Sequence, residues 1–241
     1  MSHVFRQEWF AVRRSRSILL FFVIAIAIAL LAAVPSVPSY RVSGMTGFDA
    51  FIRALTDSPY AALMGSILAG LYFGVGFQQR TIHLSITAGL SRVAVFVSKT
   101  ALFLSLAVSA VLLYSICRGV SAAVVNGWGR VPLAQVVWVT AIGVSMYMLI
   151  FSVFVFIAFR VRDTGKTIGI SILVYLAYSM LYTMVTPGLL LFAEVSPAVV
   201  FDRIAEYNLS AAKGSVAAIA AVIGAVAMAG VTYVRFRKSD L

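Results

Sequence analysis

Six long apolar runs constrain this chain more than any other feature of its sequence. A helix that crosses the hydrocarbon core of a bilayer needs about 20 apolar residues, and six segments meet or nearly meet that length. They cover residues 17–34, 59–77, 93–117, 136–159, 167–185 and 216–234. A backbone inside a membrane must satisfy its own hydrogen bonds, so we expect every run to be a helix.

Composition points to the same class of protein. Of the 241 residues, 62% are hydrophobic and only 11% are charged, against about a quarter charged in ordinary soluble domains. The predicted spans use almost all of the length. We therefore expect one all-α transmembrane domain over residues 1–241, with no nucleotide-binding domain. The net charge of +11 does not indicate nucleic acid, because Lys and Arg stand at the ends of apolar runs.

Basic residues predict the orientation of the spans. About two thirds of the 19 Lys and Arg residues fall in the two tails and in the loops after the second and fourth spans. Basic loops face the cytoplasm, so we expect both termini there, in a multi-pass protein of the bacterial cytoplasmic membrane. A cleaved signal peptide is the alternative for residues 1–34. Its apolar run exceeds the ~7–15 residues of a signal core, and we expect the first helix to be retained.

The N-terminal tail predicts a short amphipathic helix. Phe5, Trp9 and Val12 recur at helical spacing, while Arg13 and Arg14 occupy other directions. This pattern is typical of a helix that lies in the cytoplasmic headgroup region. A plain basic flank of the first span is the alternative.

The loop after the second span predicts a second short helix, lying across the cytoplasmic face. Ile82, Ile86 and Leu90 form one helical stripe, although Ile82, Leu84 and Ile86 also alternate as in a strand. Gly89 can end this helix, and Ser91 can cap the third span. An ordinary connecting loop is the alternative, but the apolar stripe needs something to cover it.

The last external loop is too apolar for a free loop and too interrupted for a span. Residues 189–192 and 199–201 are apolar, with Glu194 and Pro197 between them. We expect a partly re-entrant element, because irregular backbone at membrane depth is tolerated where protein buries it. A continuation of the fifth span is the alternative.

Small residues in the second span predict a close helix contact. Gly70 and Gly74 form a small-xxx-small pair, and such pairs let two helix backbones approach each other in a membrane.

Catalytic motifs are missing from the sequence. Residues 164–167 resemble the end of a phosphate-binding loop, but Arg160 stands where that motif requires glycine. Only two histidines occur, and the glutamates stand apart from one another. No charged residue lies at the middle of a predicted span, where ion-coupled transporters usually carry one. We therefore expect no enzyme activity, no bound cofactor or metal, and a bundle that lacks buried ionic groups and is moved by an outside energy source.

Several short segments resemble those of the ABC-2 type transporter permeases, the membrane subunits of bacterial ABC exporters. The segments are Gln79-Arg80-Thr81-Ile82, Gly89-Leu90-Ser91-Arg92, Ser98-Lys99-Thr100 and the ending 235–241. The opening amphipathic helix, the six spans and the apolar last external loop match the family's layout. Gln78-Gln79 is a departure, since an acidic residue is often found there.

The resemblance implies a permease subunit that pairs with a second permease subunit, as a homodimer or with a sister chain. Each permease subunit would rest on one copy of a separately encoded ABC ATPase, two copies in all, which would carry ATP and Mg. The ATPase would dock on the helix at 79–92, the coupling helix. Its expected contact residues are Gln79, Arg80, Thr81, Ile82, His83, Ser85, Ile86, Gly89 and Arg92. Phe5, Trp9, Arg13 and Arg14 would form the connecting helix at the membrane surface.

The function implied is ATP-driven export of a hydrophobic or amphipathic substrate, such as an antimicrobial peptide, a drug or a lipid. Two other readings stay open. One is a non-catalytic membrane immunity or binding protein, and the other is an intramembrane enzyme.

Overall fold

The computed structural model describes residues 2–33, 36–184, 196–207 and 209–238. These residues form helices and connecting turns, with no strand among them. Six helices are long and apolar enough to cross a membrane. The prediction of an all-α protein with six spans is confirmed, and the chain is a multi-pass helical membrane protein.

The ends of the six spans lie within five residues of the predicted runs, except that α8 continues to Asn126, beyond the predicted end at residue 117. They are α2 (Arg16–Ala33), the α5–α6 segment (Ser58–Gln78), α8 (Arg92–Asn126), α9 (Leu133–Val161), α10 (Thr164–Met184) and α12 (Ala211–Lys238). The shorter helices are α1 (Ser2–Arg14), α3 (Val37–Ser43), α4 (Gly47–Leu55), α7 (Thr81–Thr87) and α11 (Pro197–Ala205). With 35 residues, α8 is about 52 Å long at 1.5 Å per residue, so it extends beyond a hydrocarbon core of about 30 Å.

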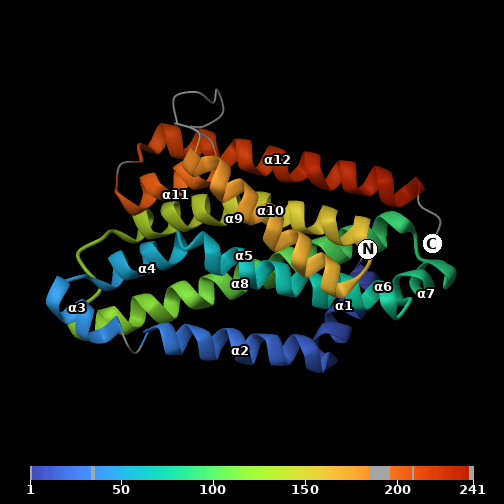
Figure 1. Cartoon of the computed structure of the whole chain (residues 1–241), viewed down its shortest axis with the longest axis horizontal. Helices are drawn as coiled ribbons and strands as arrows, with labels where there is room; N and C mark the ends of the chain where they lie inside the picture. Colours follow the sequence, from blue (N-terminus) through green and yellow to red (C-terminus); the bar gives the residue numbers. More distant parts are fainter. Residues whose placement is uncertain (1, 34–35, 185–195, 208, 239–241) are drawn as a thin grey trace.

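The long helices lie side by side as a bundle (Figure 1). Helices α8 and α9 run through its middle, with α2 packed on α8 and α12 packed on α9. Helix α7, α1 and the C-terminal turns of α12 lie at one end of the bundle, and α3 lies at the other. These are called the α7 end and the α3 end below.

The core is aromatic and lies between α5, α8 and α9. Phe73, Phe103, Phe151 and Phe154 are fully buried, and the rings of Phe73 and Phe103 lie 5.2 Å apart. By contrast, α2, α10 and α12 expose long apolar faces. Those faces are suited to lipid or to another membrane subunit.

A short buried helix, α4, precedes the second span, and the sequence did not predict it. Helix α4 runs along α8 from the α3 end, the chain breaks at Thr56 and Asp57, and α5 continues toward the α7 end. Asp57 caps α5, because its side chain accepts a hydrogen bond from the Tyr60 N–H. Tyr147 donates a hydrogen bond of 2.6 Å to the carbonyl of Leu55. A buried break is stable because such partners satisfy the freed backbone groups.

The described part of the loop between α10 and α12 forms α11. Its face of Val199, Val200, Phe201 and Ile204 is buried, and Phe201 lies 4.8 Å from the ring of Tyr147. Helix α11 therefore packs on the bundle rather than extending into solvent. The apolar residues 189–192 of the predicted re-entrant element lie outside the described residues.

Candidate functional site

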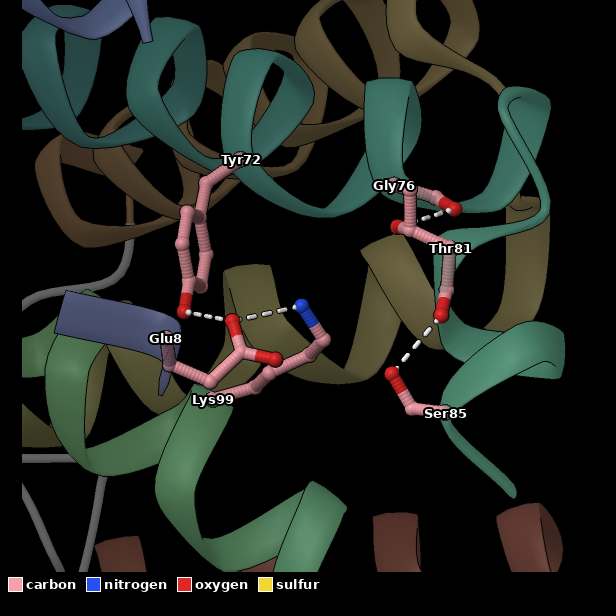
Figure 2. A network of polar contacts seen from close by, with 6 residues as sticks. All are labelled: Glu8, Tyr72, Gly76, Thr81, Ser85 and Lys99. Atoms are coloured by element: carbon pink, nitrogen blue, oxygen red, sulfur yellow. Dashed lines mark hydrogen bonds and ion pairs between the residues drawn. The ribbon is translucent and has the colours of Figure 1, made fainter. Parts of the chain in front are cut away.

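Helix α7 joins the second and third spans at one end of the bundle and packs on α6 (Val75–Gln78) and α8. Its N-cap, Arg80, has a left-handed backbone with a φ of 57°, which turns the chain sharply after α6. Thr81 donates its hydroxyl to the carbonyl of Gly76 at 3.0 Å, and Ser85 donates to Thr81 at 2.8 Å (Figure 2). The first bond fixes the start of α7 to the end of the second span, and the second, to the Thr81 carbonyl, lies within α7.

The bundle itself covers the apolar stripe of α7. Ile82 is 1% exposed, and Ile86 and Leu90 are half-buried against the core. The outward face carries Arg80, and it also carries Leu84, which is 61% exposed. Sequence reasoning left Leu84 out of the expected contact residues, although a position two residues after Ile82 lies about 200° around a helix, on the opposite side.

The predicted coupling-helix residues differ in their exposure. Gln79, Arg80, Thr81 and Gly89 are exposed; His83, Ser85, Ile86 and Arg92 are half-buried; Ile82 is buried. Arg92 donates a hydrogen bond of 2.9 Å to the carbonyl of Arg237. Arg92 therefore links the start of α8 to the end of α12, so its guanidinium is engaged within the chain.

Serine 91 caps α8, as the sequence predicts. Its hydroxyl accepts a hydrogen bond of 3.2 Å from the N–H of Ala94. This cap starts the third span directly after α7 and leaves only a short connection between the two helices.

A buried ion pair joins α1 to the bundle beside α7 (Figure 2). The Lys99 ammonium lies 2.8 Å from Glu8 Oε2, with side chains only 7% and 13% exposed. Tyr72 donates its hydroxyl to the same carboxylate oxygen at 3.2 Å, and the ammonium lies 5.3 Å from the Tyr72 ring centre. The expectation of a bundle without buried ionic groups is therefore wrong.

Lys99 lies two turns inside α8. The sequence predicts it in the loop after the second span, among the basic residues that indicate orientation. Glu8 stands in the N-terminal helix, 91 positions away. Neither residue alone indicates a pair, because only the packing of α1 on α8 brings them together. Burial of a lone Lys would cost several kcal/mol or more, and Glu8 and Tyr72 offset that cost.

Helix α1 turns one side to the bundle and the other away from it. Val4 and Val12 are buried, whereas Phe5 and Trp9 are 43% and 46% exposed. Val12 therefore does not share the outward face on which the sequence placed it with Phe5 and Trp9. Arg13 and Arg14 are exposed in the last turn of α1.

The loop after the fourth span meets the end of the second span beside α7. The Gln78 amide donates to Asp163 at 3.0 Å and accepts from the Thr164 hydroxyl at 3.1 Å. The Lys166 N–H donates to Asp163 at 2.9 Å, which caps α10. This N–H, together with the Gln78 amide, holds the pKa of Asp163 below its ordinary value. Residues 164–167 thus begin a helix rather than forming a phosphate-binding loop.

Gly70 and Gly74 lie where the second span presses on the first turns of α10. The span widens there into the π-helix η2 (Gly70–Gly74). A Cβ at Gly70 would lie 2.5 Å from Ile168 Cγ1, and one at Gly74 would lie 2.6 Å from the Thr164 Cα. Both glycines therefore permit a backbone approach that no other residue would allow without a shift.

Comparison with known proteins identifies no relative. No family model matches the chain, and no curated protein matches it.

Proposed function

We propose that this chain is the permease subunit of an ATP-driven exporter of the bacterial cytoplasmic membrane, moved by a separately encoded ABC ATPase that docks on α7. One observation carries the proposal. Helix α7 is fixed to the second span on its inner side by Thr81 and Ile82, and it presents Arg80 and Leu84 outward. A short helix in this position can receive a partner on one face and pass its movement to the spans on the other.

The contacts around α7 provide a route for that movement. Thr81 joins α7 to Gly76, and the preceding π-helix carries Tyr72, whose hydroxyl binds Glu8 beside Lys99. Gln78 joins the same segment to the start of α10. A displacement of α7 therefore acts on the second, third and fifth spans together. π-helical turns are frequent at functional sites, and η2 lies in the middle of this route.

The charge distribution supports a cytoplasmic α7 end. Arg80 and Arg162 lie beside α7, and Arg235, Arg237 and Lys238 end α12. Clusters of this kind mark the cytoplasmic side of a membrane protein. An ATPase that uses cytoplasmic ATP and Mg would reach α7 from this side, and the chain itself would hold neither.

The exposed apolar faces support a second permease subunit. Leu173, Leu181 and Met180 of α10 and Ile223 and Val226 of α12 are each at least 60% exposed. Faces of this kind fit lipid, and they also fit the homodimer or sister-chain pair that an exporter needs. Spans α2, α10 and α12 are the candidates for that contact.

An amphipathic cargo fits two cavities beside α10. A cavity of about 290 Å³ between α9 and α10 has only apolar surface and shares Ile150, Tyr175 and Tyr178 with a second cavity of about 230 Å³. Ser58 and Asp202 line the second cavity. An apolar chamber that leads to polar groups is suited to a substrate with both characters, such as a peptide or a lipid.

Co-purification with the ATPase tests the proposal. The double variant Arg80→Ala/Leu84→Ala removes the outward cation and the outward apolar side chain of α7. It should lower the amount of bound ATPase about tenfold or more, as loss of a central interface pair does, without lowering the amount of permease in the membrane. The matched control is Arg41→Ala/Val42→Ala in α3, where Val42 is 91% exposed, and it should bind the ATPase normally.

Two results would contradict the proposal. The first is normal ATPase binding by the α7 variant. The second is full protection of cells against a toxic peptide after deletion of the ATPase gene, which would favour a non-catalytic immunity protein.

A further inference from the structure

A large basic cavity opens at the α7 end, between the last turns of α9 and α12. Its volume is about 690 Å³. The cavity is lined by Phe156, Phe159, Arg160, Arg162, Thr232, Arg235, Phe236 and Lys238. The contacts proposed for the ATPase lie on α7, so this cavity is not needed for that docking.

The lining is cationic. Arg160, Arg162, Arg235 and Lys238 contribute four basic groups, and the described lining holds no carboxylate. A neighbouring cavity of about 390 Å³ shares Arg162 and adds Arg80 and His83. Several cations around one concave surface raise the local concentration of anions.

The floor of the cavity is aromatic and rigid. Phe159 and Phe236 pack edge to face at 5.1 Å, and the Arg235 guanidinium lies 5.4 Å from the ring centre of Phe156. Next to this floor, Val231 and Val234 of α12 are 50% and 52% exposed. A basic rim, an aromatic floor and an adjoining apolar helix face together match a molecule with an anionic head and a hydrocarbon tail.

We propose that this cavity binds the phosphate headgroup of an anionic phospholipid, with an acyl chain along Val231 and Val234 of α12. Basic pockets between membrane helices on the cytoplasmic side are suited to such headgroups. A free phosphate or a soluble anion would use the rim alone and leave the apolar face of α12 uncovered. The site requires the α7 end to face the cytoplasmic leaflet, but it does not require the chain to be a permease.

Lipid binding to the delipidated full-length chain in detergent tests the site. Native mass spectrometry with phosphatidylglycerol and with phosphatidylcholine gives the affinity for each. We expect tight binding of phosphatidylglycerol only, weakened about tenfold or more in Arg160→Gln/Arg235→Gln, since each cation near an anionic headgroup contributes measurably to binding. The matched control, Arg41→Gln/Arg130→Gln at the α3 end, should bind phosphatidylglycerol like the unchanged chain.

The outcomes that would overturn the proposal are distinct. Equal binding of phosphatidylcholine, or an equal loss in the control, would show general attraction of lipid to the surface. Full displacement by millimolar glycerol phosphate would show recognition of phosphate without the lipid tail. Loss of ATPase co-purification in Arg160→Gln/Arg235→Gln with no loss of phosphatidylglycerol binding would assign the cavity to the partner protein.

Arg160, Arg235 and Lys238 are exposed, so their replacement leaves the packing of the bundle intact. Lys238→Gln alone provides a smaller perturbation of the same cavity. It should weaken phosphatidylglycerol binding in the same direction as the double variant, and an unchanged affinity in both would overturn the site.

Discussion

The Lys99 ammonium and the Glu8 carboxylate lie 2.8 Å apart, with the two side chains 7% and 13% exposed. The pair fastens the amphipathic N-terminal helix to the third span, and the Tyr72 hydroxyl adds the second span to the same carboxylate. Three segments that are distant in sequence therefore meet at two charges. This junction lies beside α7, where the proposed ATPase would act.

Removal of one partner of this pair should destabilise the protein strongly. Glu8→Gln or Lys99→Met leaves the other charge buried, at a cost of about 3–5 kcal/mol. The double variant Glu8→Gln/Lys99→Met buries no charge and should recover most of that loss. Thermal unfolding of the detergent-solubilised protein measures the difference, and Arg6→Gln on the exposed side of α1 is the control. A double variant as unstable as the sum of the single variants would contradict a direct pairing.

Contact between the second span and α10 gives a second prediction. Gly74→Ala places the new Cβ against the backbone of Thr164, 2.6 Å from the Thr164 Cα. Backbone cannot move as easily as a side-chain end, so we expect a loss of about 1–3 kcal/mol in the free energy of unfolding. Gly169→Ala in α10, where no atom lies within 4 Å of the added carbon, is the matched control. It should be neutral or slightly stabilising, because alanine favours a helix.

The number and positions of the spans could be predicted because a membrane selects them by length and apolarity alone. Local chemistry also predicted the cap at Ser91, because the cap bond joins residues three positions apart. The break between α4 and α5 could not be predicted in this way. The start of α4 carries a local helix signal, the capping box of Thr46 and Asp49. The break itself depends on tertiary packing, because Tyr147 on α9 satisfies the carbonyl of Leu55.

The candidate site was predicted in position but not in its contacts. Periodicity placed a short helix after the second span, and the structure has α7 there. Periodicity also identified the apolar stripe that must be covered, but it could not tell that α6 and α8 of the same chain cover it, because that surface forms only on folding. The same limit applies to Glu8 and Lys99, whose pairing depends on tertiary packing across 91 positions.

A carboxylate at the α3 end gives a prediction about pH. Asp49 caps α4 and accepts hydrogen bonds from Thr46 and from the Tyr207 hydroxyl. Partial burial raises the pKa of Asp49, but these hydrogen bonds and the nearby Arg53 outweigh burial and hold the pKa below its ordinary value of 3.8. A lowered folded-state pKa stabilises the protein above the unfolded-state value, and that contribution is lost as the pH falls through the folded-state pKa.

The Asp49→Asn variant isolates this contribution. At pH 7 the variant should unfold at a lower temperature than the unchanged chain. The gap should close as the pH falls below about 4, because protonation then removes the same charge from the unchanged chain. The unfolding temperatures of the variant and of the unchanged chain are measured between about pH 3 and pH 7, a range in which carboxylates titrate. A gap that stays constant over this range would show that Asp49 acts through shape rather than charge.

The orientation of the bundle can be tested because the chain contains one cysteine, Cys117. In a Cys117→Ala background, Val42→Cys places a thiol on α3 and Thr87→Cys places one on α7, both at exposed positions. Basic residues gather at the α7 end, so we expect that end in the cytoplasm. A membrane-impermeant maleimide should then label Val42→Cys in intact cells and label Thr87→Cys only after the cells are permeabilised. Labelling of Thr87→Cys in intact cells would turn α7 away from cytoplasmic ATP, and no ATPase could then move the spans through it.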